Sequence, residues 1–240
     1  MVRRYPRRAL HLTEELVARV ERTEPDSGPE QGLTPLTETD VEDAAGRLLA
    51  ENQGAPFWIF AYGSLIWKPA FEPVETRPAR AYGWRRSFCL DIIRWRATPE
   101  QPGLMLALAT GGACNGLAFR LEPENPMVQM VRLLRRETDY HEDLPWVRWI
   151  TCRGGGETLR ALTFYAAPAK DAHGYRIQLP IADQARRLAR AAGHVGSGAA
   201  YLRNTVEHLE ELGIRDRYLW TLQRLVAEEI AAMPPVVAGI

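Results

Sequence analysis

The pattern of apolar and polar residues divides the chain into a part rich in strands and a part rich in helices. Short runs of aromatic and β-branched residues predict strands over 57–62 and 80–93. Glycine-rich centres predict two β-hairpins, over 103–121 and 146–166, the second with Gly-Gly-Gly-Glu as its turn. Because hairpins come first and helices last, the pattern indicates an α+β fold with a mainly antiparallel sheet or small barrel.

Helical spacing dominates the C-terminal part of the chain. Apolar residues recur with this spacing over about 181–192, 198–212 and 216–232, and they predict one helix in each segment. A glycine or a pair of prolines follows each segment, as expected where a helix ends. The fold is therefore expected to have a helical C-terminal part.

One more helix is predicted between the two hairpins, over 126–137. Asn125 is a suitable N-cap residue, and Pro126 suits the first helical position because its missing N–H has no partner there in any case. The helix is expected to end at Glu137. Its apolar face is assigned to Met127, Val128, Val131 and Leu134.

Residues 1–55 read as an N-terminal extension that precedes a domain at 56–235. Thr37 and Asp40 form a plausible capping box, and apolar residues at helical spacing then predict a helix over 38–51 with one buried face. A shorter amphipathic helix is predicted from the spacing of Leu12, Leu16, Val17 and Val20.

Composition excludes several classes of function. Lys plus Arg and Asp plus Glu both number 30, so the net charge is zero and argues against a nucleic-acid-binding protein. The three cysteines form no CxxC pair, which gives no sign of a disulfide framework or a zinc site. No apolar run approaches the roughly 18 residues of a membrane helix, and the N-terminus lacks the apolar core of a secretory signal. We expect a cytoplasmic protein without a membrane partner.

The segment 60–71, Phe-Ala-Tyr-Gly-Ser-Leu-Ile-Trp-Lys-Pro-Ala-Phe, places Gly63 and Ser64 in the middle of an apolar stretch. A strand that ends there opens a tight turn, in which glycine permits a positive φ and a close approach of a ligand to the main chain. Successive N–H groups in such a turn can bind an anion. The alternative is a strand-ending turn packed into the core, and the residues alone leave both interpretations open.

Glu137 is the second candidate for chemistry. The negative end of the helix dipole disfavours a carboxylate at the end of the 126–137 helix, and partial burial acts in the same direction. Both effects raise the pKa of the carboxyl, which suits a general base. Arg135 and Arg136 oppose this if they lie close, and a surface glutamate paired with an arginine remains the alternative.

Three segments together carry a resemblance to a known family. Residues 60–71 resemble the segment that follows the first strand of the ChaC-type γ-glutamylcyclotransferases. Residues 135–149, RRETDYHEDLPWVRW, resemble a second landmark, an Arg-Glu pair before a Tyr or Pro-Trp stretch. Residues 193–202, GHVGSGAAYL, are similar to a third, Gly-x-x-Gly-x-Asn-x-x-Tyr-Leu. Order and spacing agree, so the resemblance covers about residues 57–230.

The resemblance implies a small, mainly antiparallel β-barrel with flanking helices. It also implies a lyase, a glutathione-specific γ-glutamylcyclotransferase that forms 5-oxoproline and releases cysteinylglycine, with no metal and no cofactor. By position, Glu137 corresponds to the catalytic acid/base, and Tyr201 hydrogen-bonds the substrate. The residues that correspond to the γ-glutamyl pocket are Ala61, Tyr62, Gly63, Ser64, Leu65 and Ile66.

Two departures from the family pattern stand out. Gly198 occupies the position where the family commonly has Asn, which weakens the assignment of Tyr201. Residues 1–55 have no counterpart in short family members, and simple packing of the 38–51 helix is the expectation. Glutathione is the expected partner of a monomeric enzyme. The alternatives are a cyclotransferase for other γ-glutamyl amides or amines, and a non-catalytic regulator on the same fold.

Overall fold

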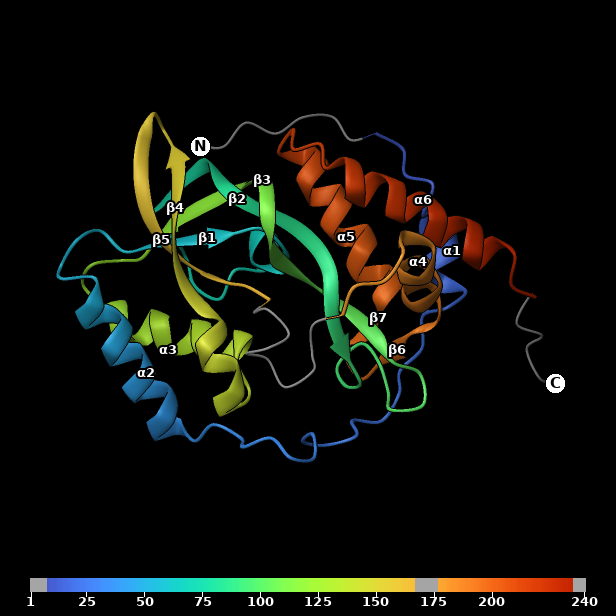
Figure 1. Cartoon of the computed structure of the whole chain (residues 1–240), viewed down its shortest axis with the longest axis horizontal. Helices are drawn as coiled ribbons and strands as arrows, with labels where there is room; N and C mark the ends of the chain where they lie inside the picture. Colours follow the sequence, from blue (N-terminus) through green and yellow to red (C-terminus); the bar gives the residue numbers. More distant parts are fainter. Residues whose placement is uncertain (1–7, 167–176, 235–240) are drawn as a thin grey trace. The chain divides into compact units, whose positions relative to one another are not determined.

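Five strands form a closed barrel in the order β1-β3-β2-β4-β5 (Figure 1). Strand β1 is antiparallel to β3 and parallel to β5, whereas β4 is antiparallel to both β2 and β5. The prediction of an α+β fold with a small, mainly antiparallel barrel is therefore confirmed. The strands are β1 (Trp58–Ala61), β2 (Glu75–Ile92), β3 (Gly103–Arg120), β4 (Val147–Gly154) and β5 (Glu157–Phe164).

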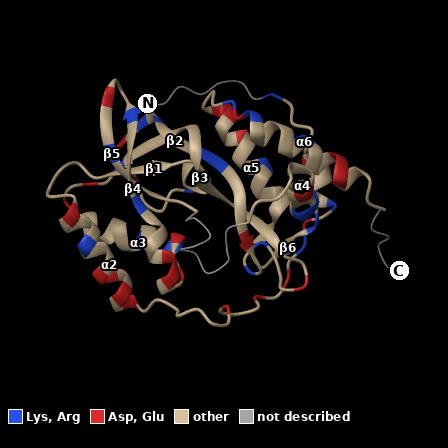
Figure 2. Ribbon diagram, in the orientation of Figure 1, with Lys and Arg blue, Asp and Glu red and all other residues tan. Residues whose placement is uncertain are grey.

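This computed structural model describes residues 8–166 and 177–234, which fall into two units. The barrel unit comprises residues 31–87 and 107–166. The helical unit comprises residues 8–30, 88–106 and 177–234. The long strands β2 and β3 contribute to both units. Acidic and basic side chains are interspersed in each unit (Figure 2), in keeping with the zero net charge of the chain.

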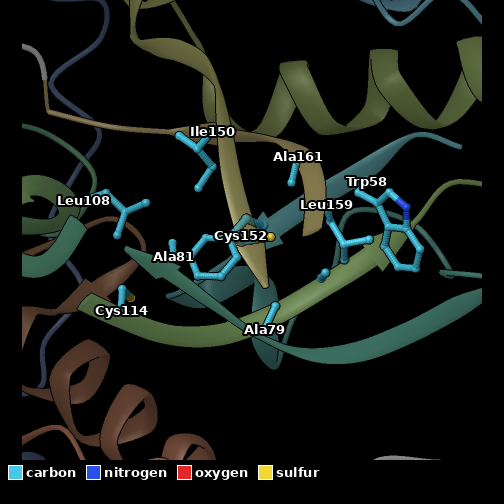
Figure 3. Packing of buried hydrophobic residues seen from close by; sticks show 11 residues of the cluster. Trp58, Ala79, Ala81, Leu108, Cys114, Ile150, Cys152, Leu159 and Ala161 are labelled. Atoms are coloured by element: carbon cyan, nitrogen blue, oxygen red, sulfur yellow. The ribbon is translucent and has the colours of Figure 1, made fainter. Parts of the chain in front are cut away.

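The core of the barrel unit is built from small and apolar side chains. Figure 3 shows Leu108, Ile150 and Leu159 gathered with smaller residues between the strands. All four residues of β1 are buried, which explains why this strand is an unbroken apolar run. The three cysteines are buried free thiols, and burial raises the pKa of Cys152 to about 11. A thiol with so high a pKa stays protonated at neutral pH, so Cys152 is a packing residue.

The two predicted hairpins had different outcomes. The second is confirmed, because β4 and β5 pair in register around Gly155 and Gly156, both with positive φ angles. The first is wrong, because 103–120 is one continuous strand of 18 residues. Gly111 and Gly112 keep positive φ angles inside that strand, as glycines at β-bulges do. The strand does not fold back because its last residues pair with β1 instead.

Two helices belong to the barrel unit, α2 (Glu38–Glu51) and α3 (Pro126–Glu137), and they pack against each other. Both predicted helices are confirmed. The capping box is confirmed as well, since the Thr37 hydroxyl accepts from the Asp40 N–H and the Asp40 carboxylate accepts from the Thr37 N–H. The second half of the predicted N-terminal extension is thus part of the barrel unit, and the predicted domain boundary near residue 55 stays a prediction.

The apolar face of α3 differs in part from its prediction. Val131 and Leu134 are buried as expected, but Met127 and Val128 are 42% and 50% exposed. Met130 and Leu133 are fully buried in their place, so the buried stripe starts later along the helix. Asn125 occupies the N-cap position without a side-chain hydrogen bond, so Pro126 alone marks the start of the helix.

The helical unit contains the three predicted C-terminal helices, which pack on one another. The described helices and short strands are α1 (Glu14–Ala18), α4 (Ile181–Arg190), β6 (Ala192–Gly193), β7 (Gly196–Ser197), α5 (Gly198–Glu211) and α6 (Arg217–Ala231). The first predicted helix is two residues too long, because Ala191 is the C-cap of α4 and Ala192 belongs to β6. No helix within the described residues is long and apolar enough to cross a membrane.

Candidate active site

The Gly63-Ser64 break is the start of a short 3₁₀ helix, η1 (Ser64–Ile66), which Tyr62 and Gly63 connect to the end of β1. Hydrogen bonds from the Ile66 N–H to the Gly63 carbonyl and from the Lys68 N–H to the Ser64 carbonyl, both 2.9 Å, close the turn. The first N–H groups of a helix have no intrahelical acceptor. In η1 these N–H groups are those of Ser64 and Leu65, and the N–H of Gly63 precedes them.

Gly63 does not have the positive φ angle that the sequence suggested. Its φ is −132° and its ψ is −131°. The close approach of main chains lies instead at Gly116 on β3, where a Cβ atom would come within 2.3 Å of the Ala61 carbonyl oxygen. Gly116 belongs to the glycine-rich run that the sequence placed in a hairpin turn. Because this run was predicted to be a hairpin turn, the sequence did not indicate that Gly116 packs against the end of β1, just before the 61–66 turn.

A buried arginine on β2, Arg86, binds main-chain carbonyls at the 61–66 turn and on β3. Arg86 is 4% exposed, and its Nε donates to the Tyr62 carbonyl at 2.7 Å while its Nη2 donates to the Asn115 carbonyl at 2.6 Å. The guanidinium thus joins the end of β1 to β3. Sequence reasoning missed this residue because nothing in the run Arg85-Arg86 distinguishes the buried arginine from the exposed one.

Glu137 is the last residue of α3, and its side chain is only 20% exposed. Burial raises the pKa of the Glu137 carboxyl above its ordinary value of 4.5, and the nearby charge and hydrogen bond of Arg136 oppose that rise. The Arg136 Nε lies 3.1 Å from the Glu137 Oε1. The sequence predicted both the rise in the Glu137 pKa from burial and the opposing effect of Arg136. Arg135 pairs instead with Glu38 on α2.

Arg136 connects the two candidate segments. Its guanidinium contacts the Glu137 carboxylate and also donates through Nη1 to the Lys68 carbonyl, just after η1. Within the barrel unit, Arg136 thus links Glu137 to the main chain at Lys68, two residues after η1, although about 70 residues separate the two segments in the sequence. A partly buried carboxylate that an arginine links to the segment after η1 is an arrangement that can move a proton near a bound anion.

The chain that follows Glu137 is held by a segment of the predicted N-terminal extension. The Leu36 N–H donates to the Asp139 carbonyl, and the His141 N–H donates to the Thr34 carbonyl, both at 2.9 Å. The Asp143 carboxylate accepts from the Asp139 and Tyr140 N–H groups, also at 2.9 Å, and so fixes this corner. Residues 34–36 thus support the end of α3, a role that no local sequence signal indicates.

Tyr201 lies in the helical unit, on α5, and is 5% exposed. Its ring meets Phe88 edge-on at 6.0 Å between centroids, and the Arg96 Cζ lies 5.2 Å from its centroid. Its expected hydrogen bond to a substrate stays a prediction. At Gly198, a Cβ atom would lie 3.1 Å from the Leu188 Cδ2, so a larger side chain there requires Leu188 to shift.

Glu21, another residue of the predicted extension, stabilises the start of α5. Its carboxylate accepts from the Ser197 N–H at 3.2 Å and from the Ser197 hydroxyl, and Ser197 is fully buried. Because Glu21→Ala leaves these donors without their acceptor, we expect a loss of about 1–3 kcal/mol in the free energy of unfolding. Chemical denaturation measures this loss.

Glu24→Ala is the matched control, because the one ion pair of Glu24 among the described residues is with Arg22, at 2.6 Å, and both side chains are partly exposed. Such pairs contribute about 0–1 kcal/mol. Equal stability of the Glu21→Ala and Glu24→Ala variants would contradict the role assigned to Glu21.

A cavity of about 620 Å³ lies at the start of β1, beside Trp58, whereas the candidate turn follows the end of that strand. Two of its arginines are paired with its own glutamates. Arg77 contacts Glu75 and lies 2.7 Å from Glu157, and Arg120 lies 3.1 Å from Glu75. These four charged groups of the cavity therefore neutralise one another.

The fold is that of the γ-glutamylcyclotransferases. A crystal structure of a gamma-glutamylcyclotransferase specific to glutathione, from yeast, superposes with a TM-score of 0.64 at 18% identity, covering 72% of this chain and 96% of that one. Residues 57–229 match the family model of the ChaC-like proteins, and the chain belongs to this family.

Two curated relatives extend the comparison. The glutathione-specific gamma-glutamylcyclotransferase of Escherichia coli (strain K12) is 33% identical over 204 residues, which are 83% of this chain and 87% of the relative. Gamma-glutamylcyclotransferase 2-3 of Arabidopsis thaliana is 31% identical over 175 residues, 70% of this chain and 87% of the relative. Both alignments extend over most of each chain, so the similarity is not confined to the motifs.

Proposed function

We propose that this protein is a γ-glutamylcyclotransferase, a lyase that converts glutathione to 5-oxoproline and cysteinylglycine. The observation that carries the proposal is the pair of segments that Arg136 links, with the partly buried Glu137 carboxylate on one side and Lys68, just after the 61–66 turn, on the other. Membership of the ChaC-like family and the names of the curated relatives support the same activity and the same substrate.

Glu137 moves the proton in the proposed reaction. The α-amine of the γ-glutamyl group attacks its own γ-carbonyl carbon, so that one C–N bond forms and the amide C–N bond to cysteine breaks. The amine is an ammonium ion at neutral pH and must first lose a proton. Glu137 takes that proton and returns one to the departing cysteine amine, and a raised pKa suits both steps. Holding the folded-back conformer accelerates this intramolecular step further.

The turn after β1 binds the anionic part of the substrate. The N–H groups at 62–65 donate to the α-carboxylate or to the oxygen that becomes negative as the γ-carbonyl is attacked. Leu65 is 6% exposed and keeps this side of the turn dry, which strengthens such hydrogen bonds. Tyr201 is proposed to hydrogen-bond the substrate as well, and the enzyme is proposed to act as a monomer without metal or cofactor.

The test of the function is release of 5-oxoproline from reduced glutathione by the purified wild-type protein. We expect kcat/KM for glutathione to exceed that for γ-glutamyl-alanine, because the Escherichia coli relative is named as specific to glutathione. Faster turnover of γ-glutamyl-alanine would instead indicate a cyclotransferase for other γ-glutamyl amides. An inactive wild type would contradict the proposal and favour a non-catalytic regulator.

A further inference from the structure

Arg86 is a buried cation bound to main-chain carbonyls. Arginine is seldom fully buried, since removing its charge from water is unfavourable unless its donors are satisfied. Here two of its donors serve the Tyr62 and Asn115 carbonyls, at 2.7 and 2.6 Å. These oxygens belong to the turn after β1 and to β3, so a single guanidinium sets the spacing between them.

The geometry of the peptide bond extends the effect of this contact to the turn. The described chain contains no cis peptide bond, so the Tyr62 C=O and the Gly63 N–H, which belong to one planar amide, point in opposite directions. A donor that holds the oxygen therefore aims the Gly63 N–H away from Arg86. A charged donor at the oxygen also polarises the amide and makes its N–H a stronger donor.

We propose that Arg86 is a positioning residue, which fixes the Tyr62–Gly63 peptide so that its N–H binds an anionic oxygen of the γ-glutamyl substrate. This inference rests on the proposed function. The anionic oxygen is either the α-carboxylate or the oxyanion that develops during ring closure. The two differ in kinetics, because binding the carboxylate acts on substrate and transition state alike, whereas the oxyanion exists only near the transition state.

The neighbouring residue offers a matched control. Arg85 lies on the same strand, but its side chain is exposed and donates to the Thr110 carbonyl. Successive side chains of a strand point to opposite faces, so Arg85→Met removes an arginine–carbonyl bond of the same kind without reaching the turn. We expect kcat/KM of Arg85→Met to remain within about twofold of wild type.

The decisive variants are Arg86→Lys and Arg86→Met, each assayed for 5-oxoproline release from glutathione and for thermal unfolding. Lysine keeps the charge but lacks the planar fork that serves two carbonyls at fixed spacing. We expect kcat/KM to fall at least about tenfold in Arg86→Lys and further in Arg86→Met. A fall confined to kcat identifies the oxyanion, and a rise confined to KM identifies the α-carboxylate. A folded Arg86→Lys with wild-type kcat and KM overturns the inference.

A second measurement does not depend on the folding of Arg86 variants. In the amide spectrum of ¹⁵N-labelled Glu137→Gln saturated with glutathione, we expect the Gly63 N–H resonance to shift downfield as it donates to the bound anion. If glutathione moves other resonances of the turn and leaves Gly63 unchanged, the inference is wrong. A wild type that releases no 5-oxoproline overturns the proposed function together with this inference. An active wild type with an unimpaired Arg86→Lys overturns the inference alone.

Discussion

Glu137→Gln is expected to lower kcat for 5-oxoproline release from glutathione by about 10²–10⁴-fold, the range that general acid–base catalysis contributes. Glutamine has nearly the same shape and keeps hydrogen-bonding capacity, but it can neither accept the ammonium proton nor return one to the leaving amine. KM should change much less, because the 61–66 turn and not Glu137 is proposed to bind the γ-glutamyl group. A steady-state assay of 5-oxoproline at neutral pH measures both constants.

The same residue predicts the pH dependence of the wild type. Glu137 acts as a base, so activity requires its ionised form and is lost as the pH falls through its pKa. Burial raises that pKa, so we expect the acidic limb of kcat/KM to lie above pH 4.5. Arg136 is the charged group that opposes the shift, and Arg136→Met should move the limb to still higher pH. A limb at or below pH 4.5 would contradict the assignment.

Stability supplies the control for Glu137→Gln. A carboxyl whose pKa is higher in the folded state than in the unfolded state binds its proton more tightly when folded. The ionised form is therefore destabilising, and its effect is greatest at pH values above the folded-state pKa. The neutral glutamine avoids this, so its free energy of unfolding at neutral pH should be unchanged or higher. If Glu137→Gln loses activity because it is unfolded, the loss does not report proton transfer. That outcome would count against the role of Glu137.

Gly116→Ala is expected to destabilise the barrel by about 1–3 kcal/mol or more, the usual effect of overpacking a core. The added Cβ would lie 2.3 Å from the Ala61 carbonyl oxygen and 3.0 Å from the Phe60 Cζ. The first of these is a main-chain atom that cannot move without displacing the end of β1. Because Tyr62 follows directly, the folded fraction should also lose activity. Chemical denaturation gives the first effect, and kcat/KM per folded molecule gives the second.

Gly46→Ala is the matched control for this substitution. Gly46 lies inside α2, and an added Cβ would meet only the Met127 Cε at 3.7 Å, an ordinary contact. Alanine is favoured over glycine inside a helix by about 0.5–1 kcal/mol. The two Gly→Ala changes should therefore act in opposite directions, and a Gly116→Ala variant as stable as wild type would refute the close approach of β3 to β1.

The sequence determined the elements whose signals are local. The helix 126–137 has the bounds predicted for it, because Pro126 begins it and apolar residues at helical spacing continue to Leu134 in its last turn. The hairpin at β4–β5 follows from glycines that adopt the positive φ angles its turn needs. Glu137 and the 61–66 turn also stood out by local chemistry, as a carboxylate at a helix end and a polar break in an apolar run. Their family pattern then gave them roles.

Only the tertiary structure decided which of these segments meet, and what holds them. Strand β3 remained unbroken because β1, more than 40 residues earlier, pairs with its end. Arg86 and Gly116 gained their importance from contacts with Tyr62 and Ala61, and residues 34–36 from contacts beyond Glu137. The physical reason is common to all three. A buried hydrogen bond or a forbidden Cβ depends on the neighbour across the fold, and local sequence does not encode that neighbour.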